Sequence, residues 1–195
     1  QRNLLLKNHN NKELRSWNKG FIVLGEEISR LRKSVFEVLE GSVSQISSAL
    51  LNKGISFQYE QGWPINQDLE ESLIKSESRD IHLKSTQVGP HRADISITYD
   101  SGSAKKQVSR GQQKLLACAM VLGSVEIVQE HVDNPILLLL DDPSAELDKN
   151  SLNKLMNEVV AMGSQIVATS IENHNDFFPG DYFVFHVEQG IIKSI

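Results

Sequence analysis

The sequence predicts an α/β fold in which helices cover a parallel sheet and a long helix forms an arm before it. First, residues 136–140 and 165–169 are short, mostly apolar runs, as expected of strands buried on both faces of a sheet. Second, helical segments precede and separate these runs, and alternating strands and helices form parallel sheets. Third, apolar residues recur every three or four positions over residues 18–51, a length that suits an arm.

Residues 1–80 are expected to form the helical arm, and residues 81–195 the C-terminal lobe of the sheet domain. Residues 1–16 are polar and helix-like, and the long helix is expected to end before Gly54. Its apolar stripe is expected to pack within the molecule rather than as a free coiled coil. That stripe comprises Leu24, Ile28, Leu31, Val35, Leu39, Val43, Ile46 and Leu50.

The remaining elements follow from local patterns. After the arm helix we expect a strand over residues 56–60, a turn at 62–64, a polar helix over 66–79 and a short strand ending at residue 87. A turn at residues 89–94 leads to a strand over 95–99 and a hairpin turn at 101–102 into a second strand over 105–108. We then expect a helix to about residue 131, the strand 136–140, a helix over 150–162, the strand 165–169 and a hairpin formed by 182–187 and 191–195.

Composition excludes several classes of protein. A hydrophobic content of 39% can form a core, and the single cysteine excludes an internal disulfide framework. No apolar run approaches the length of about 18 residues that a membrane span needs. No signal peptide pattern is present at this start, so a cytoplasmic location is expected.

The net charge of −5 argues against a general nucleic-acid binder, yet the charge is unevenly distributed. Residues 1–33 carry eight Lys/Arg against three Asp/Glu, and residues 79–114 carry seven against three. Residues 34–78 carry two against seven, and residues 115–195 carry three against twelve. The two basic stretches could contact a phosphate backbone, and they could equally be solvated faces.

Two adjacent carboxylates, Asp141 and Asp142, follow directly on the apolar run 136–140. Two charges cannot stay buried unpaired, so they must lie where the strand emerges, and ligands of open α/β sheets bind at that edge. One carboxylate could hold Mg²⁺ and the other could orient or deprotonate a water. The alternative is an acidic turn that caps the helix after it.

A second candidate site lies about 30 residues upstream, where residues 108–114 read VSRGQQK before an apolar helix. Ser109 is a natural N-cap, and Gly111 allows another group to approach the backbone closely. The start of such a helix has unpaired N–H groups and a partial positive charge, which suits a phosphate. An ordinary capped helix would carry the same pattern.

Four motifs in this order resemble the bacterial RecF proteins, a DNA-repair branch of the ABC-type and SMC-like ATPases. VSRGQQK resembles the ABC signature LSGGQ, with Arg110 in place of the first glycine. LLLLDD resembles a Walker B strand, with Asp142 where most members carry glutamate, and SAELD at 144–148 resembles the D-loop. The signature arginine, the DD pair and GPHRAD at 89–94 together resemble the RecF branch. The resemblance runs from the region of Trp17 to at least Thr169.

The sequence departs from the family in two places. It contains no GxxxxGK[ST] pattern, and the family places that P-loop in an N-terminal lobe. The resemblance therefore implies the C-terminal part of a longer protein, inactive by itself. The family also has a switch histidine after the strand that follows the D-loop. Here Ser170 stands at that position, and His174 is a substitute candidate.

The resemblance implies a mechanism and its partners. ATP with Mg²⁺ would join two copies into a homodimer, Asp141 holding the metal and Asp142 the attacking water. The signature residues Ser109, Arg110, Gly111 and Gln112, with Asp148 of the D-loop, would bind nucleotide and the opposite subunit. Such a clamp would bind DNA at single-strand/double-strand junctions and act with RecR and RecO type mediator proteins in loading recombinase onto gaps.

Four basic residues are candidates for DNA or phosphate contact: His91, Arg92, Lys105 and Lys106. Gly89 and Pro90 set a tight turn that presents the first two side chains. Arginine forks onto phosphate or carboxylate equally well, so Arg92 could instead pair with Asp94 or Asp100.

Two other functions remain open from the residues alone. Asp141 and Asp142 could serve a metal-dependent nuclease or phosphatase, which would need further carboxylates or histidines close to the pair. The chain could also be a non-catalytic scaffold whose acidic end binds a basic partner.

Overall fold

The computed structural model describes residues 2–8, 11–100, 102–145, 147–171 and 178–194. The chain forms two compact units, each built from two segments. Unit 1 comprises Gln1–Gly41 and Ile55–Gln107, and unit 2 comprises Ser42–Gly54 and Val108–Ile195. The boundary expected after residue 80 separates an arm from the C-terminal lobe of the family, which is a different division from these two units, and it stays a prediction.

Unit 1 combines helices with a small antiparallel sheet. Its helices are α1 (Arg2–Lys7), most of α2 (Asn11–Leu51), α3 (Leu69–Leu83), the 3-10 turn η1 (Pro90–Arg92) and α4 (Ala104–Gln107). Its strands are β1 (Ile55–Glu60), β2 (Asp94–Tyr99) and β3 (Gly102–Ser103), paired in the order β1-β2-β3 with Phe57 opposite Ile97. Leu6, Leu14, Leu69 and Leu73 form its most buried apolar core.

Unit 2 contains the parallel strands. It comprises the last turns of α2, then α5 (Arg110–His131), β4 (Leu137–Leu140), α6 (Lys149–Ala161), β5 (Gln165–Ala168) and the hairpin β6 (Phe185–Glu188) and β7 (Ile191–Ser194). β4 and β5 are parallel, with Leu138 opposite Ile166. Its most buried residues lie on three helices: Leu50, Ala119, Leu155, Met156 and Val159.

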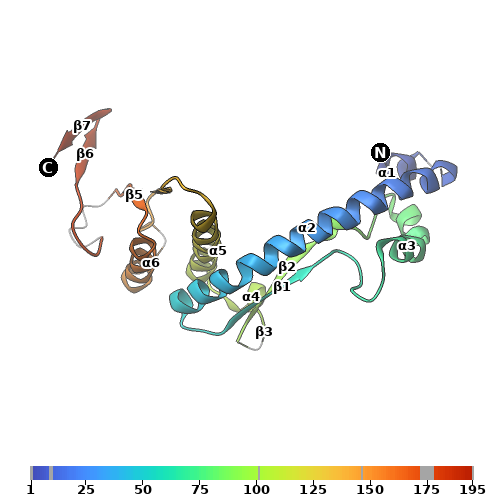
Figure 1. Cartoon of the computed structure of the whole chain (residues 1–195), viewed down its shortest axis with the longest axis horizontal. Coiled ribbons are helices and arrows are strands. Elements are labelled where there is room, and N and C mark those ends of the chain that lie inside the picture. The colour runs from blue at the N-terminus through green and yellow to red at the C-terminus, as the bar shows by residue number, and fades with distance from the viewer. Residues whose placement is uncertain (1, 9–10, 101, 146, 172–177, 195) are drawn as a thin grey trace. The chain divides into compact units, whose positions relative to one another are not determined.

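The arm helix is confirmed and begins earlier than expected, at Asn11 (Figure 1). Its stripe behaves as two halves. Val43, Ile46 and Leu50 are buried, as predicted, whereas Leu24, Ile28, Leu31 and Val35 are 41–66% exposed. The first half of α2 packs against α3 through another face of the helix, at the buried Gly25. The approach there is close, since a Cβ added at Gly25 would lie 2.6 Å from the Leu69 side chain. In that half the predicted apolar stripe is therefore not covered by the described residues, and its intramolecular packing stays a prediction.

Two predicted strands are helical or irregular. The short strand ending at Gln87 is absent, because α3 continues to Leu83 and Lys84 ends it in the left-handed conformation with φ 54°. The prediction of a second hairpin strand over residues 105–108 is wrong as well. β3 is only two residues long, and Ala104–Gln107 form a helical turn, consistent with the high helix propensity of Ala, Lys and Gln.

The strands β4 and β5 are present, but they are not buried on both faces. Leu138 is 8% exposed, whereas Leu137 and Leu139 are 50% and 71% exposed. The described part of this sheet has two strands, and Val167, which shares the open face, is 49% exposed. Whether a strand is buried depends on the helices or strands that pack on its two faces, and the apolar run alone does not show these. Within the described ranges, no helix has the length and apolar character needed to cross a membrane.

Candidate nucleotide and metal site

The two carboxylates lie where the sequence predicts, immediately after β4. The ladder continues one step past the strand pair, since the Thr169 N–H donates to the Leu140 carbonyl at 2.9 Å. This step places the Thr169 hydroxyl beside both acidic residues. It donates to Asp141 Oδ1 at 2.7 Å and accepts from the Asp142 N–H at 3.0 Å. Thr169 was not singled out from the sequence, although its place at the end of the neighbouring strand is a usable signal.

Asp142 is held from the other side by the D-loop. Its backbone is left-handed, with φ 42°, a conformation that aspartate adopts more readily than most residues. The Ser144 hydroxyl donates to Asp142 Oδ1 at 2.8 Å and lies 3.5 Å from the Ser170 hydroxyl. Ser170, at the position of the switch residue, is therefore part of this cluster. His174 lies outside the described residues.

The carboxylates fit a magnesium site of modest ligand number. Asp141 is exposed, and its Oδ2 has no hydrogen bond to a described residue. Mg²⁺ in nucleotide sites uses one or two carboxylates together with substrate phosphates and water. No group of three His, Cys, Asp or Glu side chains that could hold a metal occurs within the described ranges.

The start of α5 is a capped helix N-terminus, as the sequence predicts for Ser109. Ser109 accepts from the Gln112 N–H at 3.3 Å, and Gln112 Oε1 accepts from the Ser109 N–H at 2.9 Å, which completes a capping box. Arg110 is exposed and Gly111 is half-buried. All hydrogen bonds of Ser109 lie within this helix start, so none joins it to Asp141 or Asp142.

Asp148 of the D-loop caps the next helix. Its Oδ1 accepts from the N–H groups of Asn150 and Ser151 at 3.0 Å, and its Oδ2 accepts from the Ser151 hydroxyl at 2.6 Å. The Ser151 hydroxyl, followed by the Ser151 N–H, lowers the pKa of Asp148. The helix after the DD pair is thus capped by Asp148 and not by the pair. The carboxylates of Asp141 and Asp142 instead accept hydrogen bonds from the hydroxyl groups of Thr169 and Ser144.

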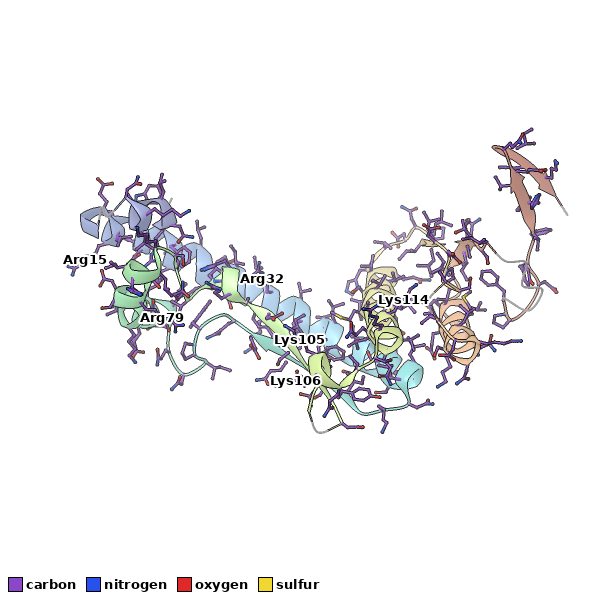
Figure 2. All side chains as sticks on the ribbon, turned by 180° about the vertical axis from the view of Figure 1, so that it is seen from behind. Arg15, Arg32, Arg79, Lys105, Lys106 and Lys114 are labelled. Carbon is purple, nitrogen blue, oxygen red and sulfur yellow. The ribbon has the colours of Figure 1, made fainter. Side chains whose placement is uncertain are left out.

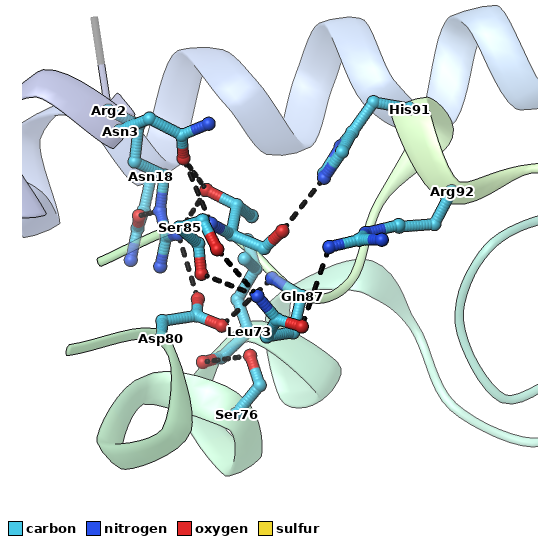
Figure 3. Close-up of polar contacts among 11 residues, drawn as sticks. Arg2, Asn3, Asn18, Leu73, Ser76, Asp80, Ser85, Gln87, His91 and Arg92 are labelled. Atoms are coloured by element: carbon cyan, nitrogen blue, oxygen red, sulfur yellow. Dashed lines mark hydrogen bonds and ion pairs between the residues drawn. The ribbon is translucent and has the colours of Figure 1, made fainter. Parts of the chain in front are cut away.

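The GPHRAD turn belongs to unit 1 and is tied to a buried ion pair (Figure 3). Arg2 Nη1 lies 2.8 Å from Asp80 Oδ2, and their side chains are 5% and 0% exposed. Asp80 Oδ1 accepts from the Gln87 N–H at 2.9 Å, and Gln87 Oε1 accepts from Arg92 at 3.4 Å. His91 Nε2 lies 2.9 Å from the Thr86 carbonyl.

Arg92 thus bonds to Gln87 and does not pair with Asp94 or Asp100. The side chains of His91 and Arg92 are both exposed. The network also explains residues 85–87, where the sequence suggested the end of a short strand. Their N–H groups donate to Asp80 and Asn3 rather than to a neighbouring strand.

Lys105 and Lys106 are exposed on α4 (Figure 2). Neither forms an ion pair or hydrogen bond with a described residue, and the same holds for Arg15 and Arg79 of unit 1. Lys105, Lys106, Arg15 and Arg79 are thus available to an anionic ligand, whereas Arg32 donates to the Pro90 carbonyl.

Comparisons with known proteins agree with these features. No protein-family model matches the chain. The DNA replication and repair protein RecF of Nitrosococcus oceani is 31% identical over the whole chain, which spans about 56% of that relative. A solved structure described as the recombination mediator protein RecF-ATP in the RecFOR pathway superposes with a TM-score of 0.74 and 25% identity, over 100% of this chain and 54% of that one. An SmcHead crystal structure shares the fold, with a TM-score of 0.51 and 15% identity over 100% and 49% of the two chains.

Proposed function

Because the chain is related over its whole length to RecF proteins, and spans about 56% of the length of such a relative, we propose that it supplies the Walker B, D-loop and signature elements of an ATPase in recombinational repair. The observation that carries this proposal is the pair Asp141 and Asp142 at the end of a parallel strand, each carboxylate bonded by one hydroxyl. In this proposal the protein works in the cytoplasm.

Each residue has a distinct role in the proposed ATPase. Mg²⁺, when bound, would neutralise phosphate charge. Asp141 would hold it through the oxygen that Thr169 leaves open, and Asp142 would orient the attacking water. The start of α5, with Ser109, Arg110, Gly111 and Gln112, would close over the γ-phosphate of ATP on a second copy, because helix N-termini bind anions. Asp148 would contact that copy while it caps α6.

The partners of the proposed protein are DNA and mediator proteins. Closure by ATP would join two copies into a clamp at single-strand/double-strand junctions. RecR and RecO type proteins would then act with it in loading recombinase onto gaps. His91, Arg92, Lys105 and Lys106, all on unit 1, would contact the DNA backbone.

The decisive experiment measures ATP turnover of the chain joined to a P-loop lobe of a RecF relative, with and without DNA. The 195 residues contain no P-loop pattern, so we expect no turnover by the chain alone. In the joined protein, Asp142→Asn is expected to reduce turnover by about 100-fold or more, the effect of losing a general base. Asp133→Asn, the same change at an exposed residue outside the site, is the control.

The signature helix is tested with Ser109→Asp. Aspartate caps helices as well as serine does, so the unfolding free energy should not change. Its carboxylate, however, would repel the γ-phosphate, so turnover should be lost and then recovered when the variant is mixed with an Asp142→Asn partner. Unchanged turnover in Ser109→Asp or in Asp142→Asn, or turnover by the chain alone, would overturn the proposal.

A further inference from the structure

We propose that Thr169 is a positioning residue that sets the arrangement of both acidic residues at the end of β4. This inference rests on the proposed function, since the arrangement matters only if Asp141 and Asp142 act on metal and water. Among the residues that the structure describes, the Thr169 hydroxyl is the one group that bonds to both, at 2.7 Å to the Asp141 carboxylate and 3.0 Å from the Asp142 nitrogen.

The direction of these two hydrogen bonds is determined by chemistry. A hydroxyl has one proton and two lone pairs, and an ionised carboxylate can only accept. Thr169 must therefore donate to Asp141, which leaves a lone pair for the Asp142 N–H. Only serine or threonine among the short side chains can make both bonds, and valine, which has the same shape as threonine, can make neither.

Each bond has a separate consequence for the site. The bond to Asp141 engages Oδ1, whereas Oδ2 has no hydrogen bond to a described residue, so this bond favours one orientation of the carboxylate proposed to bind metal. The bond from Asp142 stabilises a backbone with φ 42°, which is unfavourable for a residue with a Cβ. That backbone in turn aims the Asp142 side chain, whose carboxylate accepts from Ser144 at 2.8 Å.

The parallel register brings the hydroxyl to this place. Leu140 pairs with Ala168, so the following residues, Asp141 and Thr169, leave the sheet at the same level. The Thr169 N–H is bonded to the Leu140 carbonyl at 2.9 Å, which anchors the threonine backbone before its side chain extends. β-Branching restricts χ1, so threonine holds its hydroxyl in one direction more firmly than serine does.

The first test uses the chain itself and Mn²⁺ alone as the probe, followed by paramagnetic broadening of backbone NMR signals. Thr169→Val should weaken Mn²⁺ binding by about 10-fold, because loss of a group that orients a metal ligand typically lowers metal affinity by about 10- to 100-fold. It should also remove hydrogen-exchange protection of the Asp142 N–H. Thr169→Ser should restore both, and Thr98→Val, the same change at an exposed threonine of β2, should alter neither.

The second test measures kcat and KM for ATP in the chain joined to a P-loop lobe. At saturating Mg²⁺, where the weaker metal binding no longer limits occupancy, Thr169→Val should lower kcat and leave KM for ATP within about twofold, because the remaining effect is on the transition state. If Asp141→Asn weakens Mn²⁺ binding and Asp142→Asn lowers kcat while Thr169→Val matches wild type, the positioning role is wrong and the proposed function stands. If all three variants match wild type, the proposed function itself fails. If Thr169→Val folds poorly, Thr169→Ser and Thr169→Ala replace it. The positioning role predicts that Thr169→Ser keeps Mn²⁺ binding and the hydrogen-exchange protection of the Asp142 N–H, and that Thr169→Ala loses both; an unchanged Thr169→Ala would overturn it.

Discussion

At the scale of single residues, the Arg2–Asp80 pair shows that burial of a charge depends on its full set of partners. Asp80 is 0% exposed, and its two oxygens accept from Arg2 and from the Gln87 N–H. Arg2 in turn donates to Asn18 and Thr86. A buried pair contributes little over an apolar replacement, but a half-removed pair leaves an uncompensated charge.

We expect Asp80→Ala to reduce the unfolding free energy by about 3–5 kcal/mol, measured by urea denaturation, because Arg2 would remain buried without its partner. The double variant Arg2→Met/Asp80→Leu should cost less than Asp80→Ala alone. Asp94→Ala, at an exposed aspartate of β2, is the matched control and should change stability by no more than about 0.5 kcal/mol. An Asp80→Ala variant as stable as Asp94→Ala would contradict the prediction.

Local signals predicted the residues whose roles depend on their neighbours in sequence. Ser109 caps its helix three residues before Gln112, and Asp141 and Asp142 follow an apolar strand. Thr169 and Asp80 could not be found this way, because their partners lie 27 to 28 and 78 residues away in the chain. For Thr169 the usable signal is not local: it lies in the residue's place at the end of the neighbouring strand. For Asp80 the sequence offers no such signal.

At the scale of elements, α5 and the last turns of α2 meet at a glycine. A Cβ added at Gly123 would lie 2.7 Å from a Val43 methyl and 2.9 Å from the Val43 nitrogen. The Ser42 hydroxyl beside it donates to the Glu126 carboxylate, and its oxygen lies 3.4 Å from the Gly123 carbonyl oxygen. This close approach fixes where the two helices can cross within unit 2.

Gly123→Ala should therefore destabilise the protein, although alanine is the better helix former. Overpacking at a close contact costs about 1–3 kcal/mol, which exceeds the gain of about 1 kcal/mol in helix propensity. Gly20→Ala and Gly41→Ala are matched controls in α2, since neither added Cβ has a neighbour within 4 Å, and both should stabilise. Thermal unfolding of the three variants checks the opposite signs, and a stabilised Gly123→Ala would refute the packing argument.

Elements with a clear apolar pattern were predicted correctly: α2 and α6 by their periodicity, α5 by its apolar content after a cap, and the parallel strands by their apolar runs. The errors fall where the chain has a weak pattern and a competing partner. Residues 85–87 bond to Asp80 and Asn3 instead of forming a strand, and residues 104–107 form a helical turn instead of extending β3. Burial of β4 and of the first half of α2 was overestimated, because an apolar run does not reveal whether another layer covers it.

At the scale of the whole molecule, charge separates the two units. Unit 1 carries fourteen Lys/Arg against thirteen Asp/Glu, and unit 2 carries six against twelve. A polyanion therefore meets far less repulsion on unit 1. Nucleic acid is expected to contact unit 1, and the acidic unit 2 is expected to contribute little to its affinity.

Replacing Lys105 and Lys106 by glutamine should weaken DNA binding and lower the slope of log K against log salt by about 1–2, if each lysine neutralises one phosphate. The matched change at Lys149 and Lys154, on α6 of unit 2, should leave the slope unaltered. Fluorescence anisotropy across a salt series measures both. An equal reduction by the two double variants would show that net charge, rather than the α4 surface, governs binding.

The interleaving of the two units has a practical consequence for dissecting the protein. Because the chain passes between them at residues 41/42, 54/55 and 107/108, no single cut separates one whole unit from the other. A truncation that begins at Val108 would keep both acidic residues and the capped helix but lose Val43, Ile46 and Leu50 from the interior of unit 2. Domain trimming at that boundary should yield insoluble or molten material, so a functional minimal piece must retain the end of the long helix.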